Sequence, residues 1–583
     1  MKHLKNSLSC TNPFCFFCTM DEPNPSLRNP KIAQCFKEMP LKDNQDHVLV
    51  LSSIWNIAMS QPNDPQFPSL GIFDCMGKLI GKGIKNKEWL LKDQNIYIPY
   101  YAAHIIGSYT MNNAESAEKA VTSGVVLPLM ELLRGKITWV EQRVAVRALG
   151  HIVSHERIFQ GNVIVEYEVE MTKLAMELAC NCLNTVYKSF LGVQESKRLK
   201  YHCDLLTRGL GGEDIENKKA EEWAIQLQLW SLYLLNCFAC QERYSCLNLI
   251  CKKQFLKELC GMWGGVLGHK KSPGGIGVLR TLCNTKIGRE NIANCEEIIL
   301  SLCNTSRTSI DWQYLAIESL ILLLKDKDTK FKVLEISASF LSDLVEHRKI
   351  GEAITQALLQ DYHKIKYGFL NLKSKIQEEA LKEIWELKVE RRKKEEIISE
   401  QELEERKNLT RILKQQGNEE FRSGFIEKAV MEYTKALNFC PLKMRKERIV
   451  LYSNRAQCYL LLKKPESAIS DTTRALCLSS NANPHNKSLW RRSQAYDMRG
   501  MAKESLMDCL MFINGRMKCE EGTKHVETIP YYATRMINKQ MNATWLFGDG
   551  KLKSKVEEKN VELFNGGEEM MMMMIEIKEK QGA

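Results

Sequence analysis

Five polar residues towards the C-terminal end of the chain have the types and the spacing of a site that binds carboxylates. They are Lys414, Asn418, Asn454, Lys487 and Arg491. Residues four apart share one face of a helix, so Lys414 is expected beside Asn418 and Lys487 beside Arg491. Arginine can hold a carboxylate with two parallel hydrogen bonds, and lysine adds a compact positive charge. Together the five side chains could capture the terminal carboxylate of an acidic peptide.

The residues around these positions follow a helical repeat. From Gly417 the chain reads GNEEFRSGFIEKAVMEYTKALNFCP, with small and aromatic residues at fixed positions and a proline at the end. The positions that share this pattern are Gly417, Phe421, Ala429, Tyr433 and Ala436, then Ala456, Tyr459, Ala468 and Ala475, then Ser493, Tyr496 and Ser505. A helix–turn–helix unit of about 34 residues is typical of the tetratricopeptide repeat (TPR). The pattern predicts three units whose first helices line one groove and carry the five polar residues.

Residues 410–520 resemble the TPR domains of chaperone cofactors, which bind the C-terminal Glu-Glu-Val-Asp tail of heat-shock protein 90 or 70. That family uses a Lys–x3–Asn pair, an Asn in the second repeat and a Lys–x3–Arg pair, which stand here in LKQQGN, YSNRA and KSLWR. The resemblance implies a co-chaperone or scaffold that needs no cofactor. The alternative is a plain repeat scaffold, since the same asparagines occur in TPRs that bind no such tail.

The charge of this module agrees with an acidic partner. Residues 410–520 contain 20 Lys and Arg against 11 Asp and Glu, and the whole chain has a formal net charge of +11. A basic groove attracts an acidic tail, and it also attracts nucleic acid. Because no stacking aromatics are interleaved with the positive residues, we expect a peptide ligand. The competing interpretation is an RNA-processing scaffold that uses this basic face.

A second helical array is expected over residues 45–360. The segment Ala114–Gly135 has the form of an armadillo repeat, with a short helix, a break at Ser123–Gly124 and an amphipathic helix, and Trp139–Glu156 would open the next unit. The array resembles an armadillo or HEAT solenoid, whose extended surface commonly binds a second protein. Myosin-directed co-chaperones also combine TPR and armadillo-like parts, but they place the TPR first. A scaffold that only positions the TPR module is the alternative.

The fold class is therefore all-α, with two helical solenoids joined by a long charged helix. The segment 361–409 is rich in Glu, Lys and Arg at helical spacing, and it predicts an exposed rod or, as the alternative, a coiled-coil dimerisation segment. Residues 521–548 would cap the TPR array. Residues 549–583, with the run Met570–Met574, have the composition of a disordered tail.

The N-terminal segment 1–44 contains candidate metal ligands. Cys10, Cys15 and Cys18 fall within nine residues, and Cys35 could supply a fourth thiolate. The spacing matches no common zinc finger, and the two phenylalanines between the thiols could instead form a hydrophobic plug. We therefore predict no metal, while these four cysteines are the candidates if one binds.

The composition favours an intracellular binding protein. No apolar run reaches about 18 residues, so no membrane span is expected. The 21 cysteines are mostly scattered through helical patterns, which suits reduced thiols in the cytoplasm, with the nucleus as the alternative. No nucleophile, base and acid combine into a catalytic pattern, because His202 beside Cys203 is only a pair of sequence neighbours. We expect no enzymatic activity.

Overall fold

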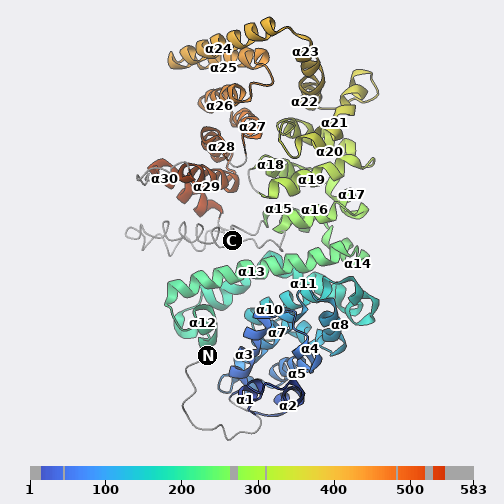
Figure 1. Cartoon of the computed structure of the whole chain (residues 1–583). Helices are drawn as coiled ribbons and strands as arrows, with labels where there is room; N and C mark the ends of the chain where they lie inside the picture. The colour runs from blue at the N-terminus through green and yellow to red at the C-terminus, as the bar shows by residue number, and fades with distance from the viewer. Residues whose placement is uncertain are drawn as a thin grey trace. The chain divides into compact units, whose positions relative to one another are not determined.

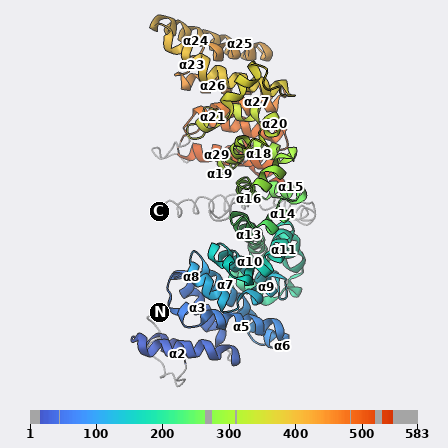
Figure 2. The same ribbon diagram turned by 90° about the vertical axis from the view of Figure 1, so that its right-hand side faces the viewer.

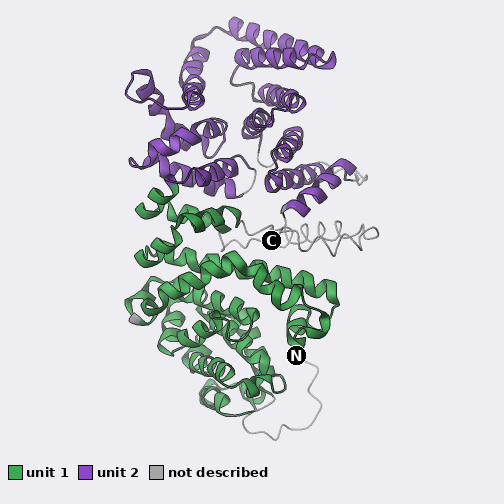
Figure 3. Cartoon of the chain, turned by 180° about the vertical axis from the view of Figure 1, so that it is seen from behind, with its two compact units in different colours: residues 1–292 green, residues 293–583 purple. Residues whose placement is uncertain are grey.

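The described part of the protein is built from helices. The computed structural model describes residues 15–43, 46–262, 274–308, 311–480, 483–518 and 529–544, and every regular element among them is a helix (Figure 1, Figure 2). The chain divides into two compact units, residues 1–292 and 293–583 (Figure 3). The prediction of an all-α fold of helical repeats is confirmed.

The first unit is a succession of short and medium helices. They are α1 (Phe16–Met20), α2 (Pro25–Glu38), α3 (His47–Ser60), α4 (Gln66–Ser69), α5 (Ile72–Lys85), α6 (Lys87–Leu91), α7 (Ile98–Thr110), α8 (Ala114–Thr122), α9 (Val126–Leu133), α10 (Trp139–Val153), α11 (Asn162–Val186), α12 (Lys200–Thr207), α13 (Glu213–Cys240), α14 (Tyr244–Ile250), α15 (Lys253–Gly261), α16 (Gly274–Leu282) and α17 (Lys286–Ala293). Short 3-10 turns occur at Met39–Leu41, Asn95–Tyr97, Glu156–Gln160 and Glu195–Lys197, and a π turn occurs at Tyr187–Leu191.

The armadillo-type unit expected after residue 113 is present. Helix α8 ends before Ser123, and Gly124 adopts a φ of +76°, which a side chain would disfavour. Helix α9 follows at once, and Thr138 then caps α10 by accepting a hydrogen bond from the Val140 backbone N–H. The two helices of the unit and the opening helix of the next unit therefore occur in the predicted order.

Helices α3, α7, α10 and α13 pack against one another in sequence. Small residues allow the close approach that the sequence predicted. A Cβ at Gly150 of α10 would lie 2.7 Å from the ring of Tyr233 on α13, and one at Gly107 would lie 3.3 Å from Cα of Ala148. Helix α11, the π turn and α12 come between α10 and α13 in the chain, although α10 and α13 pack directly on each other.

The second unit contains the remaining helices. They are α18 (Glu296–Ser306), α19 (Asp311–Lys325), α20 (Lys330–Ser342), α21 (Gly351–Lys366), α22 (Lys375–Trp385), α23 (Arg391–Ile397), α24 (Glu400–Arg422), α25 (Ile426–Phe439), α26 (Arg445–Leu461), α27 (Pro465–Leu478), α28 (Asn486–Met498), α29 (Ala502–Lys518) and α30 (Tyr531–Thr544), with a π turn at Glu386–Glu390. The boundary between the two units, at residues 292 and 293, lies inside the range predicted as one array.

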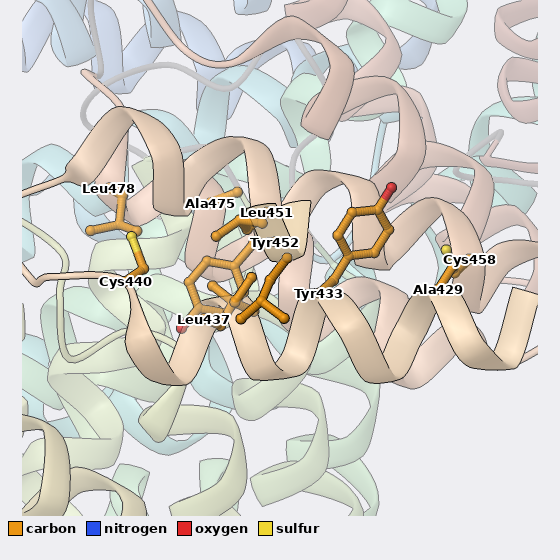
Figure 4. Close-up of a cluster of buried hydrophobic side chains, with 11 residues drawn as sticks. Ala429, Tyr433, Leu437, Cys440, Leu451, Tyr452, Cys458, Ala475 and Leu478 are labelled. Carbon is orange, nitrogen blue, oxygen red and sulfur yellow. The ribbon is translucent and has the colours of Figure 1, made fainter. Parts of the chain in front are cut away.

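Three helical hairpins form the predicted TPR array, in the pairs α24 with α25, α26 with α27, and α28 with α29 (Figure 1). Their core contains the small and aromatic residues of the repeat. Tyr433 of α25 packs where Gly417 of α24 has no side chain, and a Cβ there would lie 2.7 Å from the ring. Figure 4 shows Tyr433 among the buried residues of the first two hairpins. Helix α30 packs on α29 and buries Ala533.

The charged segment before the array is helical but interrupted. Helix α22 continues through the π turn into α23, which ends at Ile397. Ile398 then adopts an extended conformation, with a ψ of 146°. Ser399 caps α24 by accepting a hydrogen bond from the Glu402 backbone N–H. A serine cap competes with continued helix, which explains why the predicted single rod is broken here.

Ion pairs join the TPR array to the helices that precede it within the second unit. Arg474 of α27 donates from Nε to Oδ1 of Asp343 at 2.8 Å and from Nη2 to Oε2 of Glu383 at 2.9 Å. Arg448 of α26 donates from Nη1 to Oε1 of Glu346 at 2.8 Å. Asp343 is 1% exposed, so its contact with Arg474 belongs to a packed interior. The first helices of the hairpins still present the candidate site.

Candidate functional site

The structure places the five predicted site residues on the first helices of the three hairpins. Lys414 and Asn418 lie on α24, Asn454 lies on α26, and Lys487 and Arg491 lie on α28. Hydrogen bonds connect neighbouring hairpins at these positions. Nδ2 of Asn454 donates to Oδ1 of Asn418 at 3.3 Å. The asparagines of the first two hairpins are therefore in direct contact.

Arg491 connects the third hairpin to the second. Its Nη1 donates to the backbone oxygen of Ser453 at 2.7 Å and to the hydroxyl of the same residue at 2.6 Å, and its Nε donates to Oε1 of Gln457 at 3.0 Å. Burial lowers the pKa of Arg491, but an arginine remains charged at neutral pH. The described residues provide no hydrogen-bond partner for Nη2, so this nitrogen is available to a ligand.

Tyr433 is a site residue that the sequence analysis assigned only to the core. Its hydroxyl donates to Oδ1 of Asn418 at 2.8 Å. Burial raises its pKa to about 12, so the hydroxyl remains a donor at neutral pH. Tyr433 and Asn454 both donate to the Asn418 oxygen, and the described residues provide no hydrogen-bond partner for its amide nitrogen. The aromatic position of the repeat was the only sequence signal for this role.

Glu447 is the second residue that the sequence analysis missed. Its Oε2 lies 2.7 Å from Nζ of Lys414, and both side chains are about one third exposed or less. Glu447 stands in the first turn of α26, so a carboxylate of the second hairpin already pairs with the Lys414 ammonium of the first hairpin. A peptide carboxylate would have to share or displace this contact. The pair joins residues 33 positions apart, and no local pattern predicts it.

Lys487 differs from Lys414 because it is exposed and forms no ion pair with any described residue. The neighbouring His485 adds no charge at neutral pH. Burial, together with the positive charges of Arg491 and Lys487, lowers the pKa of His485 to about 4. The α28 end of the site therefore carries two cations whose contacts within the described chain include no carboxylate.

The arrangement can bind an anion at one end and hydrogen-bond a peptide at the other. Lys487 and Arg491 offer uncompensated positive charge, and charge-assisted hydrogen bonds to carboxylates are the strong ones. Asn418 and Asn454 provide neutral donors beside them, and Lys414 provides a cation that is partly neutralised by Glu447. The geometry is suited to binding, and it contains no group that is activated for catalysis.

The residues around His202 form a buried polar cluster of a structural kind. Nε2 of His202 lies 2.5 Å from the hydroxyl of Tyr201, and Tyr201 also contacts Thr138 and Glu141. Thr138 and Glu141 are the cap and the third residue of α10, a pattern that stabilises helix starts. Burial raises the pKa of the adjacent Cys203 thiol to about 11. The thiolate that a nucleophile requires is therefore not populated at neutral pH.

The N-terminal cysteines are only partly within the described residues. Cys10 lies outside them, Cys15 and Cys35 are half-buried, and Cys18 is exposed. Burial raises the pKa of Cys35 to about 11, which disfavours the thiolate that binds metal. Phe16, between two of the thiols, is buried, and its ring centroid lies 6.4 Å from that of Phe67. In the described chain, no three His, Cys, Asp or Glu side chains are grouped to hold a metal.

None of the described helices is both long enough and apolar enough to cross a bilayer.

Comparison with known proteins gives one family match and several short ones. The family model for plant ARM repeats matches residues 7–252. Protein unc-45 homolog B of Danio rerio is 34% identical over 96 residues, which are 16% of this chain and 10% of that protein. Mitochondrial import receptor subunit TOM70 of Rattus norvegicus is 33% identical over 95 residues, 16% of this chain and 15% of that protein.

Another relative is the DnaJ homolog subfamily C member 7 homolog of Schizosaccharomyces pombe, which is 38% identical over 96 residues, 16% of this chain and 19% of that protein. The chain thus matches only about a tenth to a fifth of the length of these relatives. Among solved structures, an engineered protein matches 64% of this chain and 97% of its own chain at 14% identity and a TM-score of 0.19. The family match, the sequence relatives and the helical fold agree that this chain is a helical-repeat protein with armadillo-like and TPR-like parts.

Proposed function

We propose that this protein is an adaptor whose TPR groove binds the acidic C-terminal tail of heat-shock protein 90 or 70 while its armadillo-like array binds another protein. The observation that carries the proposal is the pair Lys487 and Arg491 on α28. Arg491 contacts Ser453, the neighbour of Asn454, Lys487 lies one turn earlier on the same helix, and no carboxylate of the described chain pairs with either. A peptide that ends in aspartate brings two carboxylates to one point, which is the charge that this end of the site lacks.

The strength of such binding is limited by the size of the site. A short peptide held by a few charge-assisted hydrogen bonds is expected to bind in the micromolar range, about −7 to −8 kcal/mol. The contact between Lys414 and Glu447 lowers the contribution of Lys414, because its ammonium must exchange one carboxylate for another. Most of the electrostatic free energy of binding is therefore assigned to Lys487 and Arg491.

Calorimetry with the full chain tests this proposal. We would titrate a peptide that ends in Met-Glu-Glu-Val-Asp, and the same peptide amidated at its C-terminus. The test variant is Lys487→Ala/Arg491→Ala. The matched control is Lys428→Ala/Lys435→Ala, which removes two exposed cations from α25. We expect micromolar binding that is lost on amidation, weakened at least tenfold in the test variant and unchanged in the control.

Two results would contradict the proposal. One is the absence of binding by the folded protein, and the other is equal binding of the free and amidated peptides. Salt dependence distinguishes the competing nucleic-acid interpretation. Binding of single-stranded RNA should weaken as a steep power of the salt concentration, because several counterions are released. A tail held through two carboxylates should lose much less affinity over the same range.

A further inference from the structure

Helix α10 in the first unit carries two buried arginines that face its neighbours α7 and α13. Arg143 is 5% exposed and Arg147 is 8% exposed. The two are four residues apart, so their guanidinium groups follow one another along the same face of the helix. Both arginines lie within residues 7–252, the part that matches the plant ARM repeat model.

Their contacts are to aromatic and neutral polar groups. The guanidinium carbon of Arg143 lies 3.8 Å from the ring centroid of Trp223, Nη1 donates to Oε1 of Gln226 at 2.6 Å, and Nε has no hydrogen-bond partner. The guanidinium carbon of Arg147 lies 5.5 Å from the ring centroid of Trp230, and Nη1 lies 3.1 Å from Nδ1 of His104. Burial and then the charge of Arg147 keep the pKa of His104 well below its usual value, so His104 is neutral.

Other buried arginines of the described chain show what is missing here. Each of them contacts a carboxylate: Arg198 pairs with Glu216, Arg307 with Asp343, Arg448 with Glu346 and Arg492 with Asp508. Of the arginines buried to this degree in the described residues, Arg143 and Arg147 are the two without such a partner. Burying a charge without a compensating charge is unfavourable, so the exception requires an explanation.

No acid of the surrounding helices forms an ion pair with either arginine. Helix α13 carries five acids, and the one next to Trp223, Glu222, pairs instead with Lys219 at 2.9 Å. Helices α3 and α7 contain no Asp or Glu at all. The one acid on α10, Glu141, instead accepts a hydrogen bond from the hydroxyl of Tyr201. Within the described unit the two guanidinium groups therefore have no carboxylate in direct contact, and Glu141 acts on Arg143 only at a distance. Burial, together with repulsion from Arg143, lowers the pKa of Arg147 to about 10, which still leaves it protonated at neutral pH.

Aromatic side chains complete a surface that has the composition of a protein interface. His104, Trp223 and Trp230 are each partly exposed beside the buried arginines. Tryptophan, tyrosine and arginine are the residues enriched where proteins bind one another most strongly. Tyr100 stacks on Trp223 with the ring centroids 6.2 Å apart, and Trp230 packs edge to face against His151 and Tyr233. That packing leaves few ring faces for bases to stack on, which favours a peptide over single-stranded RNA.

We propose that this arginine–aromatic surface (Tyr100, His104, Arg143, Arg147, Trp223 and Trp230) binds an acidic segment of a partner protein. A Glu or Asp side chain of the partner supplies the carboxylate that Arg143 and Arg147 lack, and apolar residues next to it pack on Trp223 and Trp230. Charge complementarity selects this occupant, since the surface presents two cations and no acid. The inference specifies the second binding surface of the adaptor proposed above and rests on that part of the proposed function.

The test uses the full chain and a defined probe. An N-acetylated, C-amidated octapeptide of alternating Glu and Leu is titrated while tryptophan fluorescence is recorded, beside a peptide of alternating Gln and Leu. Amidation removes the terminal carboxylate, so the TPR site does not contribute. We expect binding of the Glu-Leu peptide alone, weakened at least tenfold in Arg143→Gln/Arg147→Gln. The variant Lys136→Gln/Arg157→Gln, which removes two exposed cations of the same unit, should bind as the wild type does.

The unfolding temperature gives a second readout, because a structural role of the two arginines predicts that their removal lowers it. If the arginines serve binding, the unfolding temperature of Arg143→Gln/Arg147→Gln without peptide should equal or exceed that of the wild type. If the double variant fails to fold, Arg147→Gln alone gives the same comparison. The proposal is overturned if folded wild-type protein does not bind the Glu-Leu peptide, if the Gln-Leu peptide binds equally, or if polyuridylate RNA binds in its place. The Lys487→Ala/Arg491→Ala variant, which lacks the proposed TPR cations, should bind the Glu-Leu peptide as the wild type does. This result would show that the peptide does not bind at the TPR site.

Discussion

Two groups of buried arginines in this protein differ in whether their charge is matched. In the second unit, Arg448 and Arg492 are each 1% exposed, and each holds a carboxylate with two nitrogens. In the first unit, Arg143 and Arg147 are almost as deeply buried, but they contact only aromatic rings and neutral polar atoms. The residue type and the burial are alike, and only the partner differs.

The difference separates a structural use of arginine from a binding use. A buried pair is costly to break, because removal of one partner leaves the other charge uncompensated. The Arg448 pair joins the TPR array to Glu346, which follows α20, and the Arg492 pair joins α28 to α29 within the third hairpin. An unmatched buried charge contributes less to folding, but it can gain a partner when another molecule binds. The predictions below test this distinction, beginning with the matched group.

The largest effect is expected when a matched arginine loses its carboxylate. Arg492 holds Asp508 through two hydrogen bonds of 2.7 and 2.8 Å, and both side chains are 1% exposed. Asp508→Ala should lower the free energy of unfolding by about 3–5 kcal/mol, as measured by urea denaturation of the full chain. The control is Asp497→Ala, whose carboxylate pairs with the exposed Lys539. A change below about 1 kcal/mol for Asp508→Ala would show that the matched pair is not structural.

The next effect concerns Glu141, the acid that shares α10 with the unmatched arginines but does not pair with them. Burial raises its pKa from 4.5 to about 7, although hydrogen bonds from Thr138 and Tyr201 oppose the shift. Between pH 4.5 and 7 the folded state binds more protons than the unfolded state, so the free energy of unfolding falls as the pH rises. The loss attributable to Glu141 should be on the order of 3 kcal/mol.

Glu141→Gln provides the measurement for this pH dependence. Thermal unfolding followed from pH 4.5 to pH 7.5 should decline less steeply in the variant than in the wild type. Other titrating groups, such as Glu221, are present in both proteins and cancel in the comparison. Parallel profiles for the two proteins would mean that Glu141 is charged in the fold, and that it could compensate Arg143 after all.

The fold could be predicted largely because the repeat imposes local spacing. Gly417 and Tyr433 stand sixteen residues apart in one hairpin and meet in the core as expected. The five site residues also fell on the first helices, since their positions follow the repeat. A hairpin of about 34 residues fixes which faces its own helices share.

Contacts between distant segments could not be predicted in this way. Arg474 pairs with Asp343 across 131 residues, and Arg143 stacks on Trp223 across 80 residues whose repeat spacing is irregular. Even Glu447, on the hairpin next to Lys414, was missed, because its side chain could equally have pointed into solvent. Charge matching is a property of the packed structure, and a single sequence does not encode it locally.

A smaller effect of opposite sign is expected for an unmatched arginine. Arg147→Met removes a charge that has no carboxylate partner and keeps most of the apolar volume. The variant loses the contacts of Arg147 to His104 and Trp230. This loss is offset because the fold no longer has to remove a charged guanidinium from water. The free energy of unfolding should rise by zero to about 2 kcal/mol, whereas Arg492→Met should lower it. A loss of more than about 1 kcal/mol in Arg147→Met would place Arg147 with the structural arginines.

The smallest effect concerns Lys414 and Glu447, a matched pair that is partly exposed and lies inside the proposed binding site. Glu447→Gln removes the competing carboxylate and leaves the Lys414 ammonium to a peptide. Exposed ion pairs contribute about 0.2–1 kcal/mol, so the Met-Glu-Glu-Val-Asp peptide should bind the variant roughly twofold to fivefold more tightly. Glu427→Gln, an exposed acid on α25, makes the same change in net charge and should leave the affinity unaltered.

Calorimetry on the three proteins decides whether a matched pair can also restrict binding. Tighter binding by Glu447→Gln alone means that the internal carboxylate occupies a position that the ligand requires. Equal gains in both variants would indicate a general effect of net charge, and weaker binding by Glu447→Gln would indicate that the pair holds Lys414 in place for the ligand. Only the first result makes Lys414 intermediate between the two groups of arginines. Its ammonium would then pair with Glu447 in the free protein and with a ligand carboxylate in the complex.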